Sequence, residues 1–483
     1  MLCSSSSDSN IKKKYYLCGA ANDAAPNFNH MRRLFLIISA AIMTLSAAAA
    51  DKDQAPVSKN NFKLYGFIRN YMPFDSRESV SGTGDLFYYL PKDVKMQDGI
   101  DLNDQSSMRF LALTSRLGMD VSGLTIGNVS FGAKIEGDFY SGITKSSDGN
   151  ATAYFPSNTN ISGTAQGRLR QAYATVTWKG TDETAWNSIS VKAGQAWHPM
   201  AADHPHLFSL EAGAPFGPFS RTPQIMMDVN YDKLILSAAA IWQMQYQSNG
   251  PIGNSAMYMK YGMMPEVYAA VGYKEGNFLF RVGADVLSIK PRVLGKNSES
   301  KTVKVSDRKT SVLFYAYSQY SEGKFGIKAK TTFGESGEHM NLMSGYAKVN
   351  ELADGTWEYA SLRNSSSMVS LSYGKTWQGV LFLGYVKNLG LADPVKTETI
   401  KASDVYFCSN GFSNLNQLFR FNPQIIYNIG KMNLGFEYQI TSAQYGDYKK
   451  VDGVNHLNAN ALATDNLHWV TNHRLNMMIK FNF

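Results

Sequence analysis

Three histidines stand close together in the chain and are the residues best suited to binding a metal. They are His198, His204 and His206, and an imidazole ring is a common ligand of zinc. A zinc site needs three or four ligands, yet no Cys or carboxylate completes a set with these histidines at the usual spacing. The sequence therefore favours histidines without a metal, and we expect no cofactor.

A membrane-embedded hydrolase would instead need a Ser–His pair oriented by a third group. Ser, Asn and His occur throughout the chain, but no spacing places them together. The sequence shows neither a phosphate-binding glycine loop nor a dinucleotide fingerprint. Its Lys and Arg residues are dispersed rather than clustered beside aromatic residues. We therefore expect no enzyme and no nucleic-acid partner.

Most charged residues that could act on a solute alternate with apolar ones. Lys134, Glu136 and Asp138 lie in such an alternating run at 129–138, and the same rhythm recurs near the C-terminus at 475–483. A period of two places polar and apolar side chains on opposite faces of a strand. A soluble β-sandwich shows the same alternation, so periodicity alone leaves both architectures open.

Strand lengths favour a membrane barrel. We predict about sixteen strands, each close to or longer than the ~9–11 residues that a tilted strand needs to cross a bilayer. They cover residues 62–74, 108–121, 127–140, 167–178, 188–198, 220–231, 233–247, 258–275, 277–292, 304–321, 324–336, 357–378, 379–390, 414–429, 431–446 and 465–483.

The connections between these strands alternate in length. Short turns, such as 122–126 and 275–277, alternate with long polar segments such as 75–107 and 391–413. A sandwich has no reason to sort its connections in this way. The sequence thus predicts an all-β protein, a transmembrane antiparallel β-barrel with short periplasmic turns and long extracellular loops. An even strand number closes the sheet and leaves no free edge.

The first part of the chain has the character of an export signal. Basic residues at 32 and 33 precede an apolar run, and three alanines at 48–50 resemble a cleavage site. A short membrane anchor is the alternative, but no stop-transfer charges follow. We expect an upstream extension at 1–30, a signal peptide at 31–50, a short periplasmic leader at 51–61 and the barrel at 62–483. The location expected is the outer membrane of a Gram-negative bacterium, in contact with lipid and lipopolysaccharide.

The composition agrees with this class of protein. Charged residues make up 18% of the 483 residues, below the roughly 25% of ordinary soluble domains. Only the run at 34–50 approaches the length of a transmembrane helix. Cys408 is the only cysteine beyond the predicted leader, so we expect no intramolecular disulfide. The terminal Phe483 ends an alternating strand, as in chains that the outer-membrane assembly machinery inserts.

A barrel of this size encloses water rather than a packed interior. The segment after the fifth strand, residues 198–220, either folds inward and narrows the lumen or forms a surface loop, and the sequence leaves both open. In the inward case, Asp203 and Glu211 would face Arg116, Arg168 and Arg170 across the narrowest point. The residues predicted to line this constriction are Arg116, Arg168, Arg170 and Arg221 on its basic side, Lys134 and Lys192 beside them, and Glu136, Asp138, Asp203 and Glu211 opposite.

Seven segments share their order and spacing with a known family. They are 114–119, 133–139, 168–173, 193–199, 221–224, 420–424 and 435–438. In these segments the chain resembles the trimeric outer-membrane porins related to the dicarboxylate porin DcaP. The resemblance implies a sixteen-stranded barrel, a homotrimer and the passage of small, often anionic solutes. Segments 75–107, 337–356 and 391–413 do not match, and 51–61 is too short for the coiled coil that family members can carry.

Two functions remain open at this point. The first is a porin for passive diffusion of small hydrophilic solutes, with a mild preference for anions such as dicarboxylates. The second is a barrel without transport, whose long loops make it a surface adhesin or a partner in a larger complex.

Overall fold

The computed structural model describes residues 61–82, 86–145, 159–335, 337–408 and 411–483. The predicted upstream extension at 1–30, the signal peptide at 31–50 and almost all of the leader at 51–61 lie outside the described residues and stay predictions. None of the helices in the described ranges has the length and apolar character needed to cross a membrane.

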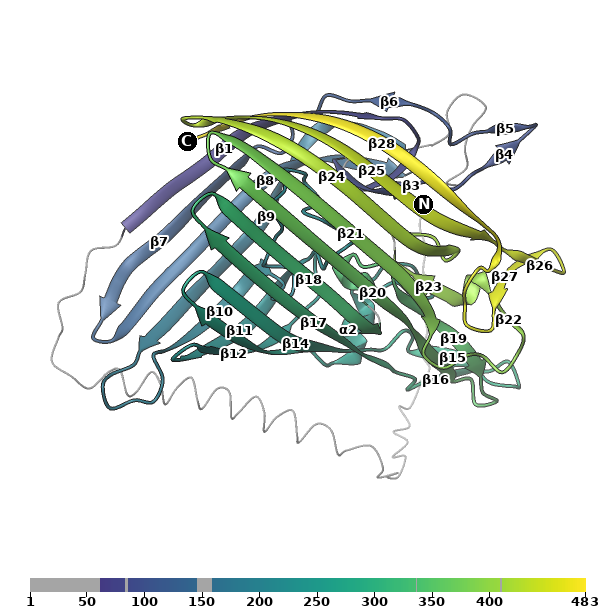
Figure 1. The fold of residues 1–483 in the computed structure, drawn as a ribbon. Coiled ribbons are helices and arrows are strands. Elements are labelled where there is room, and N and C mark those ends of the chain that lie inside the picture. The colour runs from purple at the N-terminus through teal and green to yellow at the C-terminus, as the bar shows by residue number, and fades with distance from the viewer. Residues whose placement is uncertain (1–60, 83–85, 146–158, 336, 409–410) are drawn as a thin grey trace, which may run out of the picture. The chain divides into compact units, whose positions relative to one another are not determined.

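Sixteen antiparallel strands form a closed barrel, as the sequence predicts (Figure 1). Each strand pairs with the next along the chain, and pairing of the first with the last closes the ring, with Phe67 opposite Asn482. The strands are β1 (Asn61–Asp75), β7 (Arg116–Ile126), β8 (Val129–Lys145), β9 (Thr159–Lys179), β10 (Ser188–Trp197), β11 (Arg221–Tyr231), β12 (Leu234–Ile241), β13 (Glu266–Glu275), β14 (Phe278–Ile289), β17 (Lys309–Glu322), β18 (Phe325–Glu335), β20 (Trp357–Gly374), β21 (Trp377–Leu391), β24 (Leu415–Ile429), β25 (Met432–Asp447) and β28 (Asp465–Asn482).

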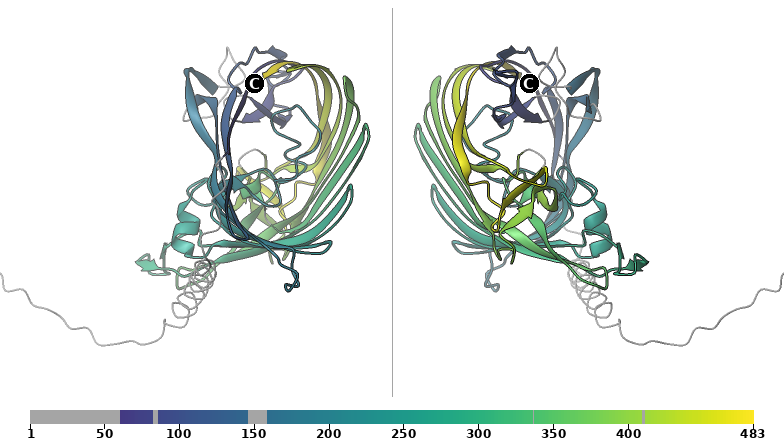
Figure 2. Two further views of the ribbon diagram at one scale, coloured as in Figure 1. Left: turned by 90° about the vertical axis from the view of Figure 1, so that its left-hand side faces the viewer. Right: turned by 90° about the vertical axis from the view of Figure 1, so that its right-hand side faces the viewer.

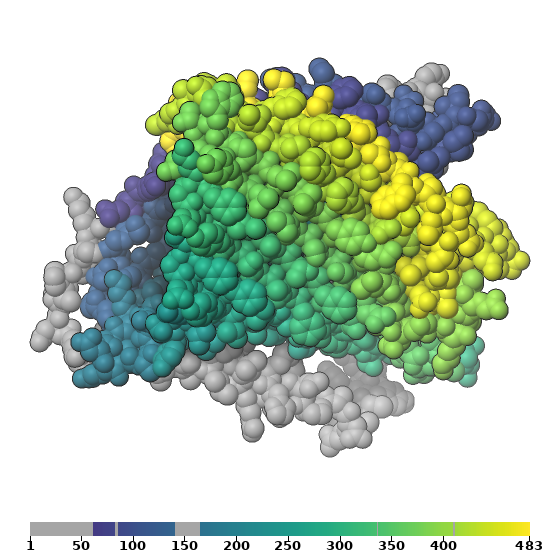
Figure 3. All heavy atoms as spheres, viewed as in Figure 1, coloured from purple at the N-terminus to yellow at the C-terminus, as the bar shows by residue number. Residues whose placement is uncertain are grey.

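The alternating residues form a barrel whose apolar side chains face outward and whose polar side chains face inward. In β28, Met477 is 49% exposed on the outer face, whereas Asn472 and Asn476 on the inner face are 0% and 4% exposed. Figure 3 shows neighbouring strands packed side by side into a continuous outer wall. A soluble sheet buries its apolar face, so the opposite arrangement is that of a barrel surrounded by lipid.

Turns and loops are sorted by length around the ring. Two-residue turns join β13 to β14 and β24 to β25, where Gly276 and Gly430 have φ of 53° and 54°. Only glycine adopts this left-handed conformation at no steric cost. The long connections lie at the opposite ends of the strands, and they carry the small elements β2 (Ser79–Gly82), β3 (Phe87–Pro91), β4 (Met96–Gln97), β5 (Ile100–Asp101), β6 (Ser107–Met108), α2 (Met257–Gly262), β15 (Leu294–Lys296), β16 (Thr302–Lys304), η1 (Glu338–Met340), β19 (Gly345–Glu351), β22 (Thr399–Lys401), η2 (Ala402–Asp404), β23 (Val405–Phe407), β26 (Lys449–Val451) and β27 (Val454–Asn458).

Several predicted strand boundaries are wrong, and three of them show why. The strand predicted to start at residue 108 begins at Arg116, because the preceding residues turn back along β1. The strand predicted from residue 258 begins at Glu266, and helix α2 precedes it. The turn predicted at 122–126 lies within β7, which continues to Ile126. In each case a tertiary contact or a local turn overrides a short run of alternating residues.

Two long connections fold into the barrel (Figure 2). One contains the β2–β3 hairpin, and the other is residues 198–220, here called the inner loop. The ring of Phe87 in the hairpin packs edge to face on Phe219 of the inner loop, with ring centres 5.5 Å apart. The ring centres of Phe216 and Phe382, the latter on the inner face of β21, lie 6.0 Å apart. These side chains belong to one buried apolar cluster. The lumen is therefore narrowed by packed loop residues, although the strand side chains that face it are largely polar.

Candidate functional site

A row of basic side chains lines the inner face of the first strands of the barrel. We call Arg69, Arg116, Lys134, Arg168, Arg170 and Arg221 the basic wall; they lie on β1, β7, β8, β9 and β11. Strand register assembles the centre of this wall, because Asp138 of β8 stands opposite Arg116 on one side and Arg168 on the other. Opposite charges at directly paired positions attract across a sheet.

Two carboxylates hold the middle of the basic wall. Arg168 donates two hydrogen bonds to Asp138, at 2.9 and 3.0 Å. Arg170 lies between both acids, donating to Glu136 Oε1 at 2.9 Å and to Asp138 Oδ2 at 2.6 Å. Both carboxylates are buried. Charge-assisted, bidentate bonds of this kind fix the orientation of a guanidinium group. The prediction that Glu136 and Asp138 lie across the lumen from the arginines is thus wrong, because both carboxylates lie among the arginines on the same wall.

Three other members of the basic wall, Arg69, Arg116 and Arg221, have weaker charge compensation. Arg116 approaches Glu136 only at 3.5 Å. Within the described residues, Arg69 and Arg221 have no carboxylate oxygen within 4 Å; they donate to neutral oxygens of Thr114 and Gln245. The basic wall therefore carries more positive than negative charge.

Aromatic rings position these less compensated arginines. The guanidinium carbons of Arg69 and Arg116 lie 4.7 and 5.0 Å from the centre of the Phe67 ring. Arg221 lies 4.9 Å from the ring of Trp197. A ring face attracts a cation without neutralising it. The rings thus hold the arginines in place; Arg69 and Arg116 stay partly exposed, whereas the Arg221 side chain is 2% exposed.

Lys134 and Lys192 lie nearer the short-turn ends of their strands. Lys134 forms an ion pair with Asp120 at 2.6 Å and donates to the Tyr65 hydroxyl at 3.0 Å. Lys192 lies over the ring of Tyr173 at 5.4 Å. The row of basic side chains therefore continues through Lys134 and Lys192 towards the short-turn end of the barrel.

Two cavities border the basic wall and the inner loop. The first, of about 200 Å³, lies between Arg116, Arg168 and Arg170 on one side and Leu207 and Phe208 on the other. The second, of about 310 Å³, is lined by Lys480, His206 and Phe208. Arg69 lines both cavities, as do the inner-loop residues Pro205, Leu207 and Phe208. The space inside the barrel is thus pinched where the inner loop approaches Arg69.

The acidic residues of the inner loop do not face the basic wall, which corrects the expectation for them. Asp203 pairs with Arg281 of β14 at 2.6 Å, and Glu211 pairs with Arg420 of β24 at 3.3 Å. Their partners lie on the opposite strands, because the inner loop crosses the lumen and is anchored there. Lys330 of β18 strengthens this anchorage by donating to the Met200 carbonyl at 2.7 Å.

Arg420, which sequence reasoning left out of the site, joins both inward connections to the barrel. Its side chain is 1% exposed. It donates to the carbonyl oxygens of Ala214 in the inner loop and Tyr89 in the hairpin, at 3.3 and 2.7 Å, and to Thr441 Oγ1 at 3.1 Å. Its place in the alternation of β24 was the only available signal, since its partners are distant in sequence. Arg420 therefore determines how far the two connections enter the lumen.

Burial raises the pKa of Glu211 to about 7, even though Arg420 opposes the shift. A carboxyl whose pKa is raised on folding stabilises the fold fully below its unfolded pKa of about 4.5 and progressively less as the pH rises through 7. We expect the free energy of unfolding to fall by about 3 kcal/mol between pH 4.5 and pH 8 from this group.

Glu211→Gln is expected to remove this part of the pH dependence. Guanidinium unfolding of the refolded barrel, followed by tryptophan fluorescence between pH 4.5 and 8, measures it. Glu299→Gln is the matched control, because Glu299 is 65% exposed in a loop. Equal pH profiles for the unaltered chain and Glu211→Gln would contradict the assignment.

The three histidines do not form a common site. His204 packs edge to face on Trp197 at 4.3 Å, and burial, together with Lys330 and Arg170, lowers its pKa to about 3. His206 lies by the second cavity. His198 is separate from both, and its ring contacts Glu266 of β13 at 2.9 Å.

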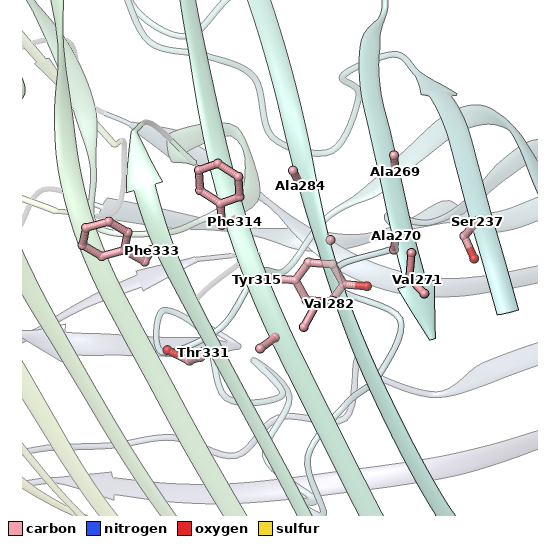
Figure 4. Close-up of a pocket in the computed structure, with 12 residues that line it drawn as sticks. Ser237, Ala269, Ala270, Val271, Val282, Ala284, Phe314, Tyr315, Thr331 and Phe333 are labelled. Carbon is pink, nitrogen blue, oxygen red and sulfur yellow. The ribbon is translucent and has the colours of Figure 1, made fainter. Parts of the chain in front are cut away.

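A hollow of about 600 Å³ lies on the outer face of β12 to β18 (Figure 4). Val271, Val282, Phe314 and Phe333 line it, all of them exposed apolar side chains. Small residues such as Ala284 form its floor. Apolar side chains dominate the hollow, although Ser237, Tyr315 and Thr331 also line it.

Comparison with known proteins identifies the fold. No protein-family model matches the chain, and no curated protein sequence matches it. Among solved structures it is similar to the outer membrane channel DcaP of Acinetobacter baumannii, with a TM-score of 0.54 and 17% identity over 88% of this chain and 97% of that one. An anion-selective porin from Comamonas acidovorans has a TM-score of 0.47 and 10% identity, over 88% and 100% of the two chains. The first similarity shows that the chain has the porin fold.

Proposed function

We propose that this protein is a porin of the Gram-negative outer membrane, through which small hydrophilic solutes diffuse passively, with a preference for anions such as dicarboxylates. The observation that carries the proposal is the excess of positive charge on the basic wall beside the narrow part of the lumen. Arg69, Arg116 and Arg221 supply that excess, because carboxylates compensate them weakly.

The chemistry of the basic wall suits a carboxylate that passes without being held. Arg69 and Arg116 share the ring of Phe67, so their like charges lie near each other. An anion beside them relieves this repulsion and accepts hydrogen bonds from guanidinium groups, which match carboxylate geometry. Conduction also requires that the solute leave, and several moderate contacts along a wall permit that better than one tight site.

Each predicted pore residue has a place in the proposal. Arg116 and Arg168 are partly exposed and attract the solute directly, whereas the buried Arg170 and Arg221 act through their charge, with Lys134 and Lys192 continuing towards the short-turn end. Glu136 and Asp138 hold Arg168 and Arg170 in position. Asp203 and Glu211 anchor the inner loop to the barrel and so affect the width of the passage, rather than contacting the solute.

The proposed surroundings follow from the barrel exterior and from the family resemblance. Outer-membrane lipid and lipopolysaccharide would cover the exposed apolar side chains. The resemblance to DcaP-related porins implies a homotrimer, which we include in the proposal. We propose a channel rather than an enzyme, with the non-transport barrel as the competing function.

Swelling of liposomes that contain the refolded protein tests the proposal. Erythritol, succinate and butane-1,4-diamine have similar sizes but differ in charge. We expect each solute to enter faster than into protein-free liposomes, with succinate fastest and the diamine slowest, because the basic wall attracts anions and repels cations. Equal rates would contradict the anion preference. No swelling with any solute would contradict the channel and favour the adhesin.

A further inference from the structure

A second cluster of chemically capable side chains lies at the base of the inner loop, away from the basic wall. His198 follows directly after β10, Glu266 is the first residue of β13, and Asp285 lies in β14. The three side chains are 0%, 0% and 2% exposed. One ligand atom from each, a ring nitrogen or a carboxylate oxygen, lies within 4.8 Å of the others.

We propose that His198, Glu266 and Asp285 bind one divalent ion of a first-row transition metal, such as Zn²⁺. The His198 Nε2 atom lies 2.9 Å from Glu266 Oε1 and 3.9 Å from Asp285 Oδ1. Ligand atoms bound to one ion at about 2.1 Å each are separated by similar distances. The three side chains therefore need little movement to share a metal.

Unsatisfied oxygens are the independent observation that points to a ligand. Within the described residues, Glu266 Oε2 and Asp285 Oδ1 are buried and have no hydrogen-bond partner. A buried carboxylate oxygen without a partner is costly, and two carboxylates in one place repel each other, although Glu266 Oε1 already contacts His198 and His339. A dication would neutralise both carboxylates and supply the missing contact to both oxygens.

His339 of η1 supports the cluster from outside. Its Nε2 atom lies 2.9 Å from Glu266 Oε1, and its side chain is 2% exposed. An imidazole N–H donated to this oxygen orients the carboxylate and leaves Oε2 directed elsewhere. Hydrogen bonds of this kind commonly orient metal-binding carboxylates. His339 is therefore a positioning residue in the proposal and not a ligand.

The donor set determines the class of metal. One imidazole nitrogen and two carboxylate oxygens suit zinc and its first-row neighbours. Magnesium and calcium prefer oxygen ligands alone, so His198 disfavours both. If a metal binds His198 Nε2, the ring proton lies on Nδ1. In this structure, Nδ1 instead accepts a hydrogen bond from the Met200 N–H at 3.2 Å. We expect the metal to break that long bond and to compensate for it.

The position of the ion gives it a structural role. The His198 N–H donates to the Ser220 carbonyl at 3.0 Å, so the two ends of the inner loop meet here. A metal at His198 would connect this junction to β13 and β14. We therefore expect metal binding to stabilise the inner loop without contacting the solute.

Metal binding by the full refolded chain tests the site. After dialysis against excess Zn²⁺ and then metal-free buffer, we expect one Zn²⁺ per chain and a higher unfolding midpoint, and neither effect with Mg²⁺. Asp285→Asn and His198→Gln are expected to lose the bound Zn²⁺. His456→Gln is the control, because His456 lies in β27 and contacts Thr399. No retained Zn²⁺, or equal retention by Asp285→Asn, would overturn the proposal.

Co²⁺ provides a second measurement that needs no variant. We expect visible absorption bands of Co²⁺ bound by nitrogen and oxygen, which Zn²⁺ then abolishes by displacement. The absence of such bands from the folded, unaltered chain would also overturn the proposal. Both outcomes are independent of channel activity.

Discussion

Replacing Arg420 with Met is expected to widen the channel and to destabilise the barrel. The substitution removes the hydrogen bonds to Ala214, Tyr89 and Thr441. It also leaves Glu211 buried without its cation. Above pH 7, where Glu211 is ionised, loss of one partner of a buried ion pair costs about 3–5 kcal/mol. We expect a larger single-channel conductance, because the inner loop and the β2–β3 hairpin lose a shared attachment to β24.

The double variant Arg420→Met/Glu211→Gln separates the two effects. Glutamine carries no charge, so much of the lost stability should return, whereas the larger conductance should remain. Arg363→Met is the matched control, since the Arg363 side chain is exposed and, among the described residues, donates to the Leu391 carbonyl alone. A conductance of Arg420→Met equal to that of the unaltered chain would show that Arg420 does not hold the inward connections.

Neutralising Arg69 and Arg116 together is expected to abolish most of the anion preference. A unit charge about 4 Å from a passing ion is worth about 1 kcal/mol in a watery environment, so removing two should lower the relative permeability of anions roughly thirtyfold at low salt. The reversal potential of Arg69→Ala/Arg116→Ala in a potassium chloride gradient measures this change. It should decrease further in magnitude as the salt concentration rises.

Arg168 and Arg170 are unsuitable for this test, because their removal would strand the buried Asp138 and Glu136. The control is Lys296→Ala/Lys301→Ala, which removes the same charge from exposed loop positions. We expect the control to keep the reversal potential of the unaltered chain. If Arg69→Ala/Arg116→Ala also keeps it, then the basic wall does not select the solute.

The barrel could be predicted from the sequence because each strand carries its own signal. The alternation in 475–483 and the short turns depend on neighbouring residues only, and the structure confirms both the outward apolar face and the strand number. Strand ends were less predictable. Helix α2 replaces the start of a predicted strand, since Met257 and its neighbours alternate weakly and pack by tertiary contacts.

The candidate site could be predicted only in part. Arg116, Lys134, Arg168 and Arg170 were found because inward positions follow directly from the alternation. The partners of Asp203 and Glu211 were not, because the inner loop carries these acids across the lumen to Arg281 and Arg420. Sequence spacing also concealed the carboxylates beside His198, since Glu266 lies 68 residues further along the chain.

Single-channel recording of the purified, refolded chain in a planar bilayer tests the central claim most directly. The central claim is that a hydrated and positively charged passage runs through the closed barrel beside the inner loop. It predicts steady conductance with a reversal potential on the anion-selective side in a salt gradient. An electrically silent protein, although folded and inserted, would contradict it.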